Sequence, residues 1–256
     1  FRLFMLGAQT GIPDRDGVIF ESPFLGPGMR RSVRLNYIPC RLSLVPVLFR
    51  TNFVPNAVLL HASMIRGGKV SLGVEVNILP AAIESAKRNG GIVVVQANPQ
   101  MPYTFGDAEI SLDDIDYLIE VDEELTEAPN ISLTETSLEI GSQIASRVAN
   151  GSTLQLGIGG IPNAVIASMQ KHQGLRIYTE MFSDGVLGLA RSKAVDPEST
   201  LTASFLFGSR ELYDWVNLNE RVEMRRTEIT NDPGLIAKQP QMTSINAALE
   251  VDLHDQ

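Results

Sequence analysis

The sequence has little of what builds disulfides, metal centres or membrane spans. Its 256 residues include one cysteine, Cys40, which excludes an internal disulfide and favours a buried, unreactive thiol over a nucleophile. The three histidines are scattered, so their spacing predicts no metal site. No apolar run reaches the ~18–20 residues that a membrane-spanning helix needs, and we expect no membrane partner.

Positive charge is also scarce. The chain has 21 Lys and Arg against 30 Asp and Glu, for a net charge of −9. A nucleic-acid partner is therefore not expected, because phosphate binding requires a basic face. Arg30, Arg31 and Arg34 do cluster after two glycines. This cluster could contact a small anion or form a solvated basic face, and the sequence leaves both readings open.

The chain carries no signal or transit segment that the sequence reveals. It opens on FRLFMLG without an initiator Met and ends on VDLHDQ, just after an apolar stretch. We interpret both ends as cuts in a longer polypeptide. The single cysteine suits a reducing compartment, which predicts a cytoplasmic protein, with the mitochondrial matrix as the alternative in a eukaryote.

The apolar share of 44% and the charged share of 20% are typical of a globular protein, and the length suits one large or two ordinary domains. The run 57–62 reads as a short buried strand, 92–95 is a continuous apolar strand, 116–121 reads as another strand, and helical spacing covers 74–88. Continuous rather than alternating apolar strands predict a mostly parallel sheet that is covered on both faces.

The acidic segment 122–134 contains a proline, lacks an apolar period and reads as a linker. We therefore predict two α/β domains, 1–128 and 129–256. The pattern after the linker predicts helices at 134–150, 163–171 and 186–193, and strands at 154–158, 176–180, 201–207 and 222–229.

A glycine loop follows one of these strands. Residues 154–163 read LQLGIGGIPN, with Gly157, Gly159 and Gly160 between an apolar strand and a helix. Glycines let the backbone approach a ligand closely, and the helix that follows directs free N–H groups and its positive dipole end at the loop. The loop could thus stabilise a phosphate, a carboxylate or an oxyanion. A tight turn needed only for packing is the alternative.

A glutamate, Glu180, follows the glycine loop in the sequence. Glu180 lies 23 residues after Gly157, at the end of the next predicted strand. Ligands of open α/β sheets bind outside the carboxyl ends of the strands, where both features are expected. Glu180 could be the ribose clamp of a dinucleotide site, although Pro162 replaces the third glycine of that fingerprint. It could also be a partly desolvated nucleophile or a strand-end acid paired with an arginine.

The ordered segments GIGGIPNAV, YTEMFSDGV, TNDPGLIA and SINAALEVDL resemble the family I CoA-transferases, and in particular the acetyl-CoA hydrolase/transferase branch. That branch includes 4-hydroxybutyrate, butyryl and succinyl:acetate CoA-transferases. The first half of the chain agrees, with segments such as FMLGAQTG, GPGMRRSV, KVSLGVEVN and QANPQMPYTFGD. The resemblance covers essentially the whole chain.

The resemblance implies a fold of two similar open α/β domains with the active site between them. It implies that Glu180 attacks the acyl-CoA thioester and that Asn231, in an N-x-P segment, lies near the reacting group. It also implies that a glycine segment binds CoA and the oxyanion: Gly157, Ile158, Gly159, Gly160 and Ile161. Members act without a permanent cofactor or metal, with coenzyme A thioesters as substrates, and form homodimers or higher homo-oligomers.

The implied function is transfer of CoA between a short-chain acyl-CoA and a carboxylic acid such as acetate, by a ping-pong mechanism through a glutamyl-CoA thioester. Three alternatives remain open: an acetyl-CoA hydrolase, a dinucleotide-binding protein, and an inactive fragment of the same fold. A later glycine-rich segment that completes the CoA site of relatives is absent from these 256 residues, so activity of the chain alone is open. The sequence does not fix the acyl group or the acceptor.

Overall fold

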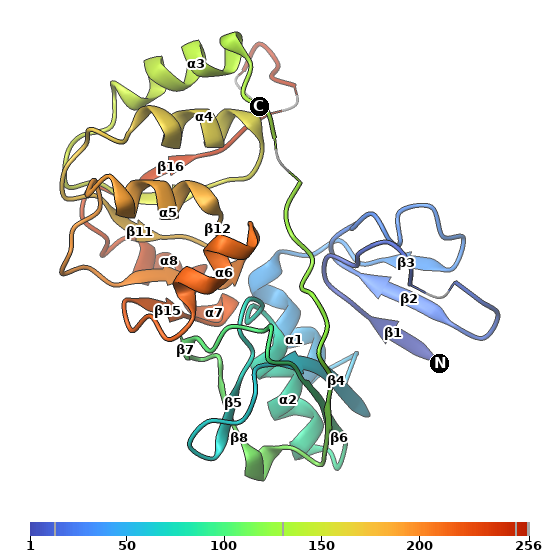
Figure 1. Cartoon of the computed structure of the whole chain (residues 1–256). Helices are drawn as coiled ribbons and strands as arrows, with labels where there is room; N and C mark the ends of the chain where they lie inside the picture. The colour runs from blue at the N-terminus through green and yellow to red at the C-terminus, as the bar shows by residue number, and fades with distance from the viewer. Residues whose placement is uncertain (13, 130, 249, 255–256) are drawn as a thin grey trace. The chain divides into compact units, whose positions relative to one another are not determined.

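The computed structural model describes residues 1–12, 14–129, 131–248 and 250–254, and it divides into two compact units, 1–53 and 54–256 (Figure 1). Both units are mixed α/β with mostly parallel strands, which confirms the predicted fold class. The predicted boundary at residues 128 and 129 lies inside the second unit. It falls in the stretch 121–129, which has neither helix nor strand, and it stays a prediction.

The first unit is a small parallel sheet followed by helical turns. Strands β1 (Arg2–Phe4), β2 (Ile19–Ser22) and β3 (Leu35–Tyr37) pair in that order, and η1 (Leu42–Leu44) and α1 (Val45–Arg50) follow. The core is apolar and gathers Ala8, Val18, Phe20 and Met29. This unit is thus built around its own core.

Two arginines of the cluster, Arg30 and Arg34, have partners within the first unit. The Arg34 guanidinium pairs with Asp14 at 2.9 Å and also with Asp16. Arg30 donates a hydrogen bond to the carbonyl of Leu25 at 3.1 Å. Because these guanidinium groups already have partners in the unit, the structure favours a solvated, ion-paired face over an anion contact.

The second unit is centred on a six-stranded parallel sheet with the order β16-β10-β11-β13-β15-β7. Its strands are β7 (Phe105–Gly106), β10 (Thr153–Leu156), β11 (Arg176–Tyr178), β13 (Leu201–Ala203), β15 (Val222–Met224) and β16 (Thr243–Ile245). A parallel three-stranded sheet has the order β4-β6-β9, with β4 (Ala57–Ala62), β6 (Ile92–Ala97) and β9 (Tyr117–Glu120). Two short pairs complete the unit: β12 (Met181–Phe182) with β14 (Phe205–Leu206), and β5 (Lys69–Ser71) antiparallel to β8 (Glu109–Ser111).

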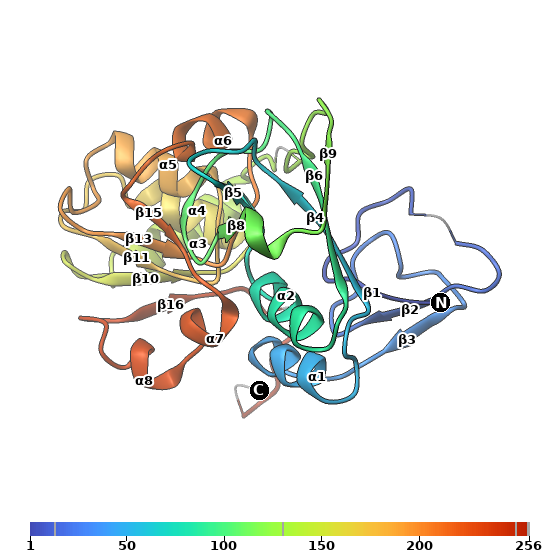
Figure 2. The ribbon, with the colours of Figure 1, turned by 90° about the horizontal axis from the view of Figure 1, so that it is seen from below.

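Helices cover both faces of the larger sheet. Figure 2 shows α5 (Asp184–Arg191) and α6 (Arg210–Val216) on one side of strands β10 to β15, and α7 (Thr227–Thr230) and α8 (Pro233–Ile236) on the other. Helix α3 (Glu135–Ala145) packs on α4 (Gly160–Ser168). Helix α2 (Leu79–Arg88) packs on β6, and η2 (Leu112–Asp114) precedes β9. The predicted coverage of both faces is wrong for the β4-β6-β9 sheet, which contains the runs at 57–62, 92–95 and 116–121. Buried and exposed residues alternate along β4, and Leu59, Tyr117 and Ile119 are exposed.

The predicted helix 74–88 is wrong in its first part, because the helix begins only at Leu79. Residues 74–77 instead lie beside 204–206. The Leu206 N–H donates to the Val74 carbonyl at 2.8 Å, and the N–H groups of Val76 and Asn77 donate to the Ser204 carbonyl at 2.9 and 3.2 Å. Pairing with a segment far along the chain has overridden the local helical spacing.

The predicted strand 222–229 is wrong in its second part. Strand β15 ends at Met224, and residues 227–230 form the short helix α7. The Thr227 N–H donates to the carbonyl of Asn77 at 2.8 Å, which takes this segment out of the sheet and toward residues 74–77. Both errors therefore occur at one place in the fold, where residues 74–77 contact residues 204–206 and the start of α7.

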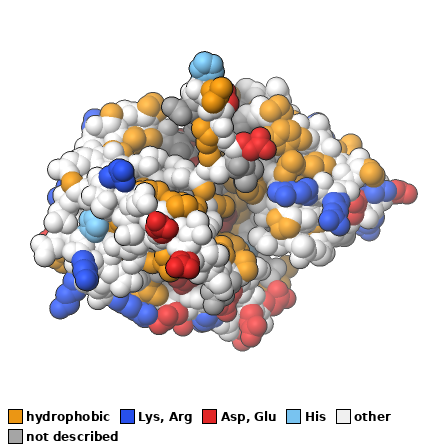
Figure 3. All heavy atoms as spheres, turned by 90° about the horizontal axis from the view of Figure 1, so that it is seen from above, with side chains coloured by type: hydrophobic (Ala, Val, Ile, Leu, Met, Phe, Trp, Pro, Cys, Tyr) orange, Lys and Arg blue, Asp and Glu red, His pale blue; other side chains and the backbone are white. Residues whose placement is uncertain are grey.

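Acidic and basic side chains are interspersed on the face shown in Figure 3, with hydrophobic side chains between them. Among the described residues, no helix combines the length and the apolar character needed to cross a bilayer.

Close packing of α3 on α4 gives a stability prediction. A Cβ on Gly141 of α3 would lie 2.6 Å from the Ala164 carbonyl carbon, whereas a Cβ on Gly188 of α5 would meet no atom within 4 Å. Gly141→Ala should therefore destabilise the protein by about 1–3 kcal/mol, because the helices must separate. Gly188→Ala should stabilise it by about 0.5–1 kcal/mol through helix propensity alone. Urea unfolding followed by circular dichroism measures both; equal effects of the two substitutions would contradict the packing.

Candidate active site

The glycine loop leaves β10 at the carboxyl edge of the larger sheet. The Gly157 N–H donates to the Ile245 carbonyl of β16 at 2.8 Å. A Cβ on Gly157 would lie 2.5 Å from Asn246 Oδ1 and 3.1 Å from the same carbonyl. Glycine is thus required here, because the loop runs against the neighbouring strand.

The next residues form the start of α4. Gly159 precedes the helix with φ of +112°, in the left-handed region that favours glycine. A Cβ on Gly160, the first residue of α4, would meet no atom within 4 Å. No side chain caps this end of the helix. Ile158 is 62% exposed and Ile161 partly buried, so an apolar rim adjoins uncapped helix N–H groups beside open space.

Thr179 fixes the residue before the candidate nucleophile to the end of β10. Its hydroxyl accepts a hydrogen bond from the Leu156 N–H at 3.0 Å and lies 3.2 Å from the Leu156 carbonyl. It also lies 3.0 Å from the carbonyl of Met181. Glu180 therefore belongs to the same sheet edge as the glycine loop. It lies in the break between β11 and β12, not inside a strand as predicted for 176–180.

Two side chains of this segment reach α7. Tyr178 and Glu180 are two residues apart, a spacing that puts side chains on one side of an extended chain. The Tyr178 hydroxyl donates to the Ile229 carbonyl at 2.8 Å. The Asn231 side-chain amide donates to Glu180 Oε2 at 3.0 Å and to Thr227 Oγ1 at 2.8 Å. The structure thus brings Glu180 and Asn231 into direct contact.

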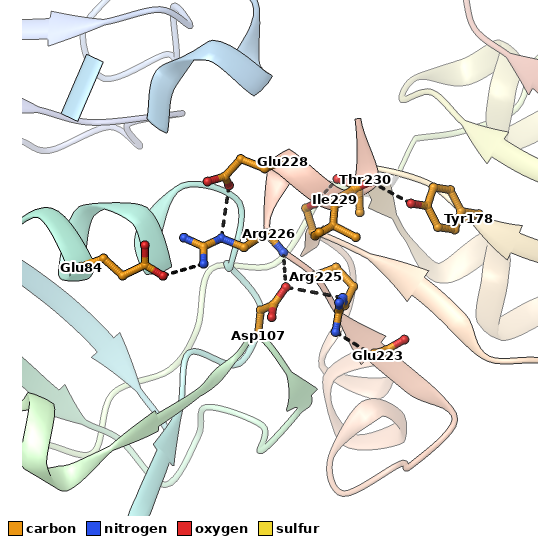
Figure 4. Close-up of polar contacts among 10 residues, drawn as sticks. Glu84, Asp107, Tyr178, Glu223, Arg225, Arg226, Glu228, Ile229 and Thr230 are labelled. Carbon is orange, nitrogen blue, oxygen red and sulfur yellow. Dashed lines mark hydrogen bonds and ion pairs between the residues drawn. The ribbon is translucent and has the colours of Figure 1, made fainter. Parts of the chain in front are cut away.

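A network of charged groups holds α7 in place (Figure 4). Arg226, just before the helix, pairs through Nη1 with Glu84 of α2 at 2.6 Å and through Nε with Glu228 at 3.3 Å. Burial acts to lower the pKa of Arg226, but pairing with these two acids outweighs it, and the pKa is raised. The guanidinium therefore stays charged and ties α7 to α2.

Asp107, which directly follows β7, supports the same segment. Its carboxylate accepts the Arg226 N–H at 3.0 Å and pairs with Arg225 at 3.5 Å, and Arg225 also pairs with Glu223 at 3.1 Å (Figure 4). The hydroxyl of Thr230 lies 2.6 Å from that of Ser204. The position of Asn231 at the end of α7 thus depends on contacts with α2, β7, β11 and the segment after β13.

A second acid approaches Glu180 from residues 74–77. Glu75 is partly buried, with Oε1 shielded from solvent and without a hydrogen-bond partner. Burial, and to a smaller extent the charge of Glu180, raise the pKa of Glu75 to about 8, while hydrogen bonds from Asn77 act in the opposite direction. Asn77 is 1% exposed, and its Oδ1 also has no partner. The site therefore places near Glu180 a second acid whose pKa is raised well above its usual range.

Glu75 and Asn77 were not predicted as site residues. The helical spacing of 74–88 predicts that the segment V-E-V-N begins a helix, and a helix would not turn Glu75 and Asn77 to the same side. A glutamate and an asparagine that alternate with valines were the available signal, because such alternation in an extended chain turns both polar groups to one side.

The assembled groups suit chemistry on an acyl group. A carboxylate held by an amide donor can act as a nucleophile, and uncapped N–H groups at a helix start can stabilise an oxyanion. Nothing in the described ranges forms a group of three or more His, Cys, Asp or Glu that could hold a metal ion. The catalytic roles of Glu180 and Asn231, and the binding roles of residues 157–161, stay predictions.

Comparison with known proteins finds the same family in both halves of the chain. Residues 12–128 match the acetyl-CoA hydrolase/transferase N-terminal domain, and residues 208–256 match the C-terminal domain of the same family. The chain is 36% identical to the 4-hydroxybutyrate coenzyme A transferase of Clostridium kluyveri over 91% of this chain and 56% of that protein. It is 37% identical to the succinyl-CoA:cyclohexane-1-carboxylate CoA transferase of Geobacter metallireducens over 85% and 51%.

The chain spans about half the length of these two curated relatives. A solved structure, the 4-hydroxybutyrate CoA-transferase of Porphyromonas gingivalis, superposes with a TM-score of 0.82 at 32% identity, over 97% of this chain and 69% of that one. Both halves of the chain and its fold therefore lead to one assignment: the protein belongs to the acetyl-CoA hydrolase/transferase family.

Proposed function

We propose that this protein transfers CoA between a short-chain acyl-CoA and a carboxylic acid, with Glu180 as the nucleophile. The observation that carries the proposal is the 3.0 Å hydrogen bond from Asn231 to Glu180, at the sheet edge from which the glycine loop also emerges. Family membership supports the same reading, because relatives in the comparison are named CoA-transferases. CoA and its thioesters are substrates in this proposal, and no resident cofactor takes part.

The first half of the reaction loads CoA onto the protein. Glu180 attacks the thioester carbonyl, the carbon–sulfur bond breaks, and CoA thiolate leaves a mixed anhydride between the acyl group and Glu180. The thiolate then attacks the glutamyl carbonyl, which releases the first carboxylate and forms a glutamyl-CoA thioester. Asn231 holds Oε2 of Glu180 and leaves Oε1 for the first attack.

The second half runs these steps in reverse. An incoming carboxylate attacks the glutamyl thioester and expels the thiolate, which then attacks the new acyl carbonyl and frees Glu180. Protons balance throughout, since each step exchanges one anion for another. Each tetrahedral intermediate carries an oxyanion, and the N–H groups of Gly160 and Ile161 at the uncapped start of α4 would stabilise it.

The loaded enzyme gives the most direct test. Incubation with acyl-CoA alone should leave a covalent CoA adduct on the peptide that carries Glu180, detected by mass spectrometry. Glu180→Ala should abolish it, whereas Glu198→Gln, an exposed acid of the same unit, should not. An adduct on Cys40 would contradict the assignment; burial raises the pKa of that thiol and so disfavours its thiolate. Turnover measured with and without acetate separates a transferase from a hydrolase.

Asn231 should contribute to rate through its contact with the carboxylate. A hydrogen bond to a charged group contributes about 1.5–3 kcal/mol, so Asn231→Ala should slow adduct formation about 10- to 100-fold. Asn231→Asp should slow it further, because a second carboxylate would face Glu180 Oε2. Stopped-flow or quench measurement of the adduct checks both; an unchanged rate in the alanine variant would remove Asn231 from the mechanism.

The glycine loop offers a matched pair of substitutions. Gly160→Ala introduces a methyl group into open space, so stability should hold while acyl-CoA binding weakens at the start of α4. Gly157→Ala should instead destabilise the fold, because its methyl group collides with Asn246 and Ile245. Thermal unfolding together with KM for acyl-CoA distinguishes them. Unchanged KM and adduct rate in a stable Gly160→Ala variant would contradict ligand binding there.

A further inference from the structure

Glu75 and Glu180 are far apart in the chain, yet backbone hydrogen bonds bring them together. The carbonyl of Glu180 accepts the N–H groups of Ser204 and Phe205 at 2.8 and 3.0 Å. Glu75 forms an isolated antiparallel bridge with Phe205, and its two following residues bind the Ser204 carbonyl. The segment 204–206 thus holds both acids, one on each side, which explains why the charge of Glu180 acts on Glu75.

The surroundings of Glu75 favour its neutral form. Glu75 Oε1 and Asn77 Oδ1 are both buried oxygen atoms without a hydrogen-bond donor. Buried acceptors without a donor are costly, and one proton on Glu75 turns an unpaired acceptor into a donor. Desolvation and the charge of Glu180 together raise the pKa of Glu75 to about 8. The unpaired oxygen atoms and the raised pKa thus both favour a protonated Glu75.

The charged groups of the neighbouring elements do not favour an ionised Glu75. The segment 204–206 carries no ionisable side chain, and Glu180 is the acid of the break between β11 and β12. On the α7 side, Glu228 and Arg226 pair with each other, Arg226 also pairs with Glu84, and Arg225 pairs with Asp107 and Glu223. These arginines are thus neutralised by other acids.

We propose that Glu75 is a positioning residue of the transfer reaction: it stays protonated beside Glu180, so that Glu180 is the one ionised carboxylate of the pair. This inference rests on the proposed function. Its chemical reason is charge. The reaction brings an anionic acid to the Glu180 thioester and forms oxyanions there, and an ionised Glu75 would oppose every one of these species through a low-dielectric site.

Glu75→Gln supplies the key variant, because glutamine is neutral and keeps a hydrogen-bond donor. Wild-type adduct formation from acyl-CoA should fall about tenfold per pH unit above about pH 8, as Glu75 ionises. The glutamine variant should form the adduct within a few-fold of the wild-type rate at pH 7 and lose this basic decline. Glu198→Gln should keep the decline. A folded but inactive Glu75→Gln protein, or an unchanged decline, would overturn the proposal.

Stability against pH tests the protonation state without any CoA chemistry. The pKa of Glu75 is about 8 in the folded protein and near 4.5 when exposed, so the folded state holds the proton more tightly. Stability should therefore fall as pH rises from about 4.5 to about 8, and should level off beyond. The urea midpoint of Glu75→Gln should match wild type near pH 5 and exceed it near pH 9.

The CoA adduct and the pH dependence of the urea midpoint distinguish a failure of the Glu75 proposal from a failure of the proposed function. A midpoint difference that does not change with pH would overturn the proposal even if transfer is confirmed. A missing CoA adduct in wild type would instead reject the proposed function, and with it the role of Glu75, whatever its protonation state. If the glutamine variant does not fold, the wild-type rate profile alone decides: a profile without a decline near pH 8 overturns the proposal.

Discussion

The site depends on the position of the Asn231 side-chain amide. Asn231 follows the four-residue helix α7 and donates a hydrogen bond to Glu180. So short a helix has little stability of its own, and its place is set by what surrounds it. Arg226 ties its start to α2, Asp107 ties it to β7, and the Tyr178 hydroxyl ties its middle to β11. The Asn231–Glu180 hydrogen bond is thus the last contact of a set that joins four parts of the second unit.

Charge is distributed unevenly across this set. The groups that hold α7 are ion pairs of arginine with aspartate or glutamate, whose charges compensate one another. The groups next to Glu180 are instead the neutral amide donor of Asn231 and Glu75, an acid whose pKa is raised. A carboxylate surrounded by neutral polar groups keeps its negative charge uncompensated, which favours attack on a carbonyl over ion pairing.

The sequence predicted the features that depend on neighbouring residues. The apolar runs of β4 and β6, the glycine loop before α4 and the acid near the end of β11 follow from local composition and spacing, and all lie close to where they were expected. It failed where distant segments meet. Residues 74–78 and 225–229 were assigned the wrong structure because Ser204 and Asn77 carbonyls, far along the chain, take their N–H groups. Glu75 was missed for the same reason, since its importance comes from a neighbour that is 105 positions away.

The break that exposes Glu180 preserves the strand register. Tyr178 lies opposite Thr202 before the break, and Met181 lies opposite Phe205 after it, so both strands advance by the same number of residues. Insertion or deletion of one residue on either strand would turn Glu180 to the opposite side of the sheet and away from Asn231. The number of residues between these two anchor pairs consequently fixes the side of the sheet on which Glu180 lies.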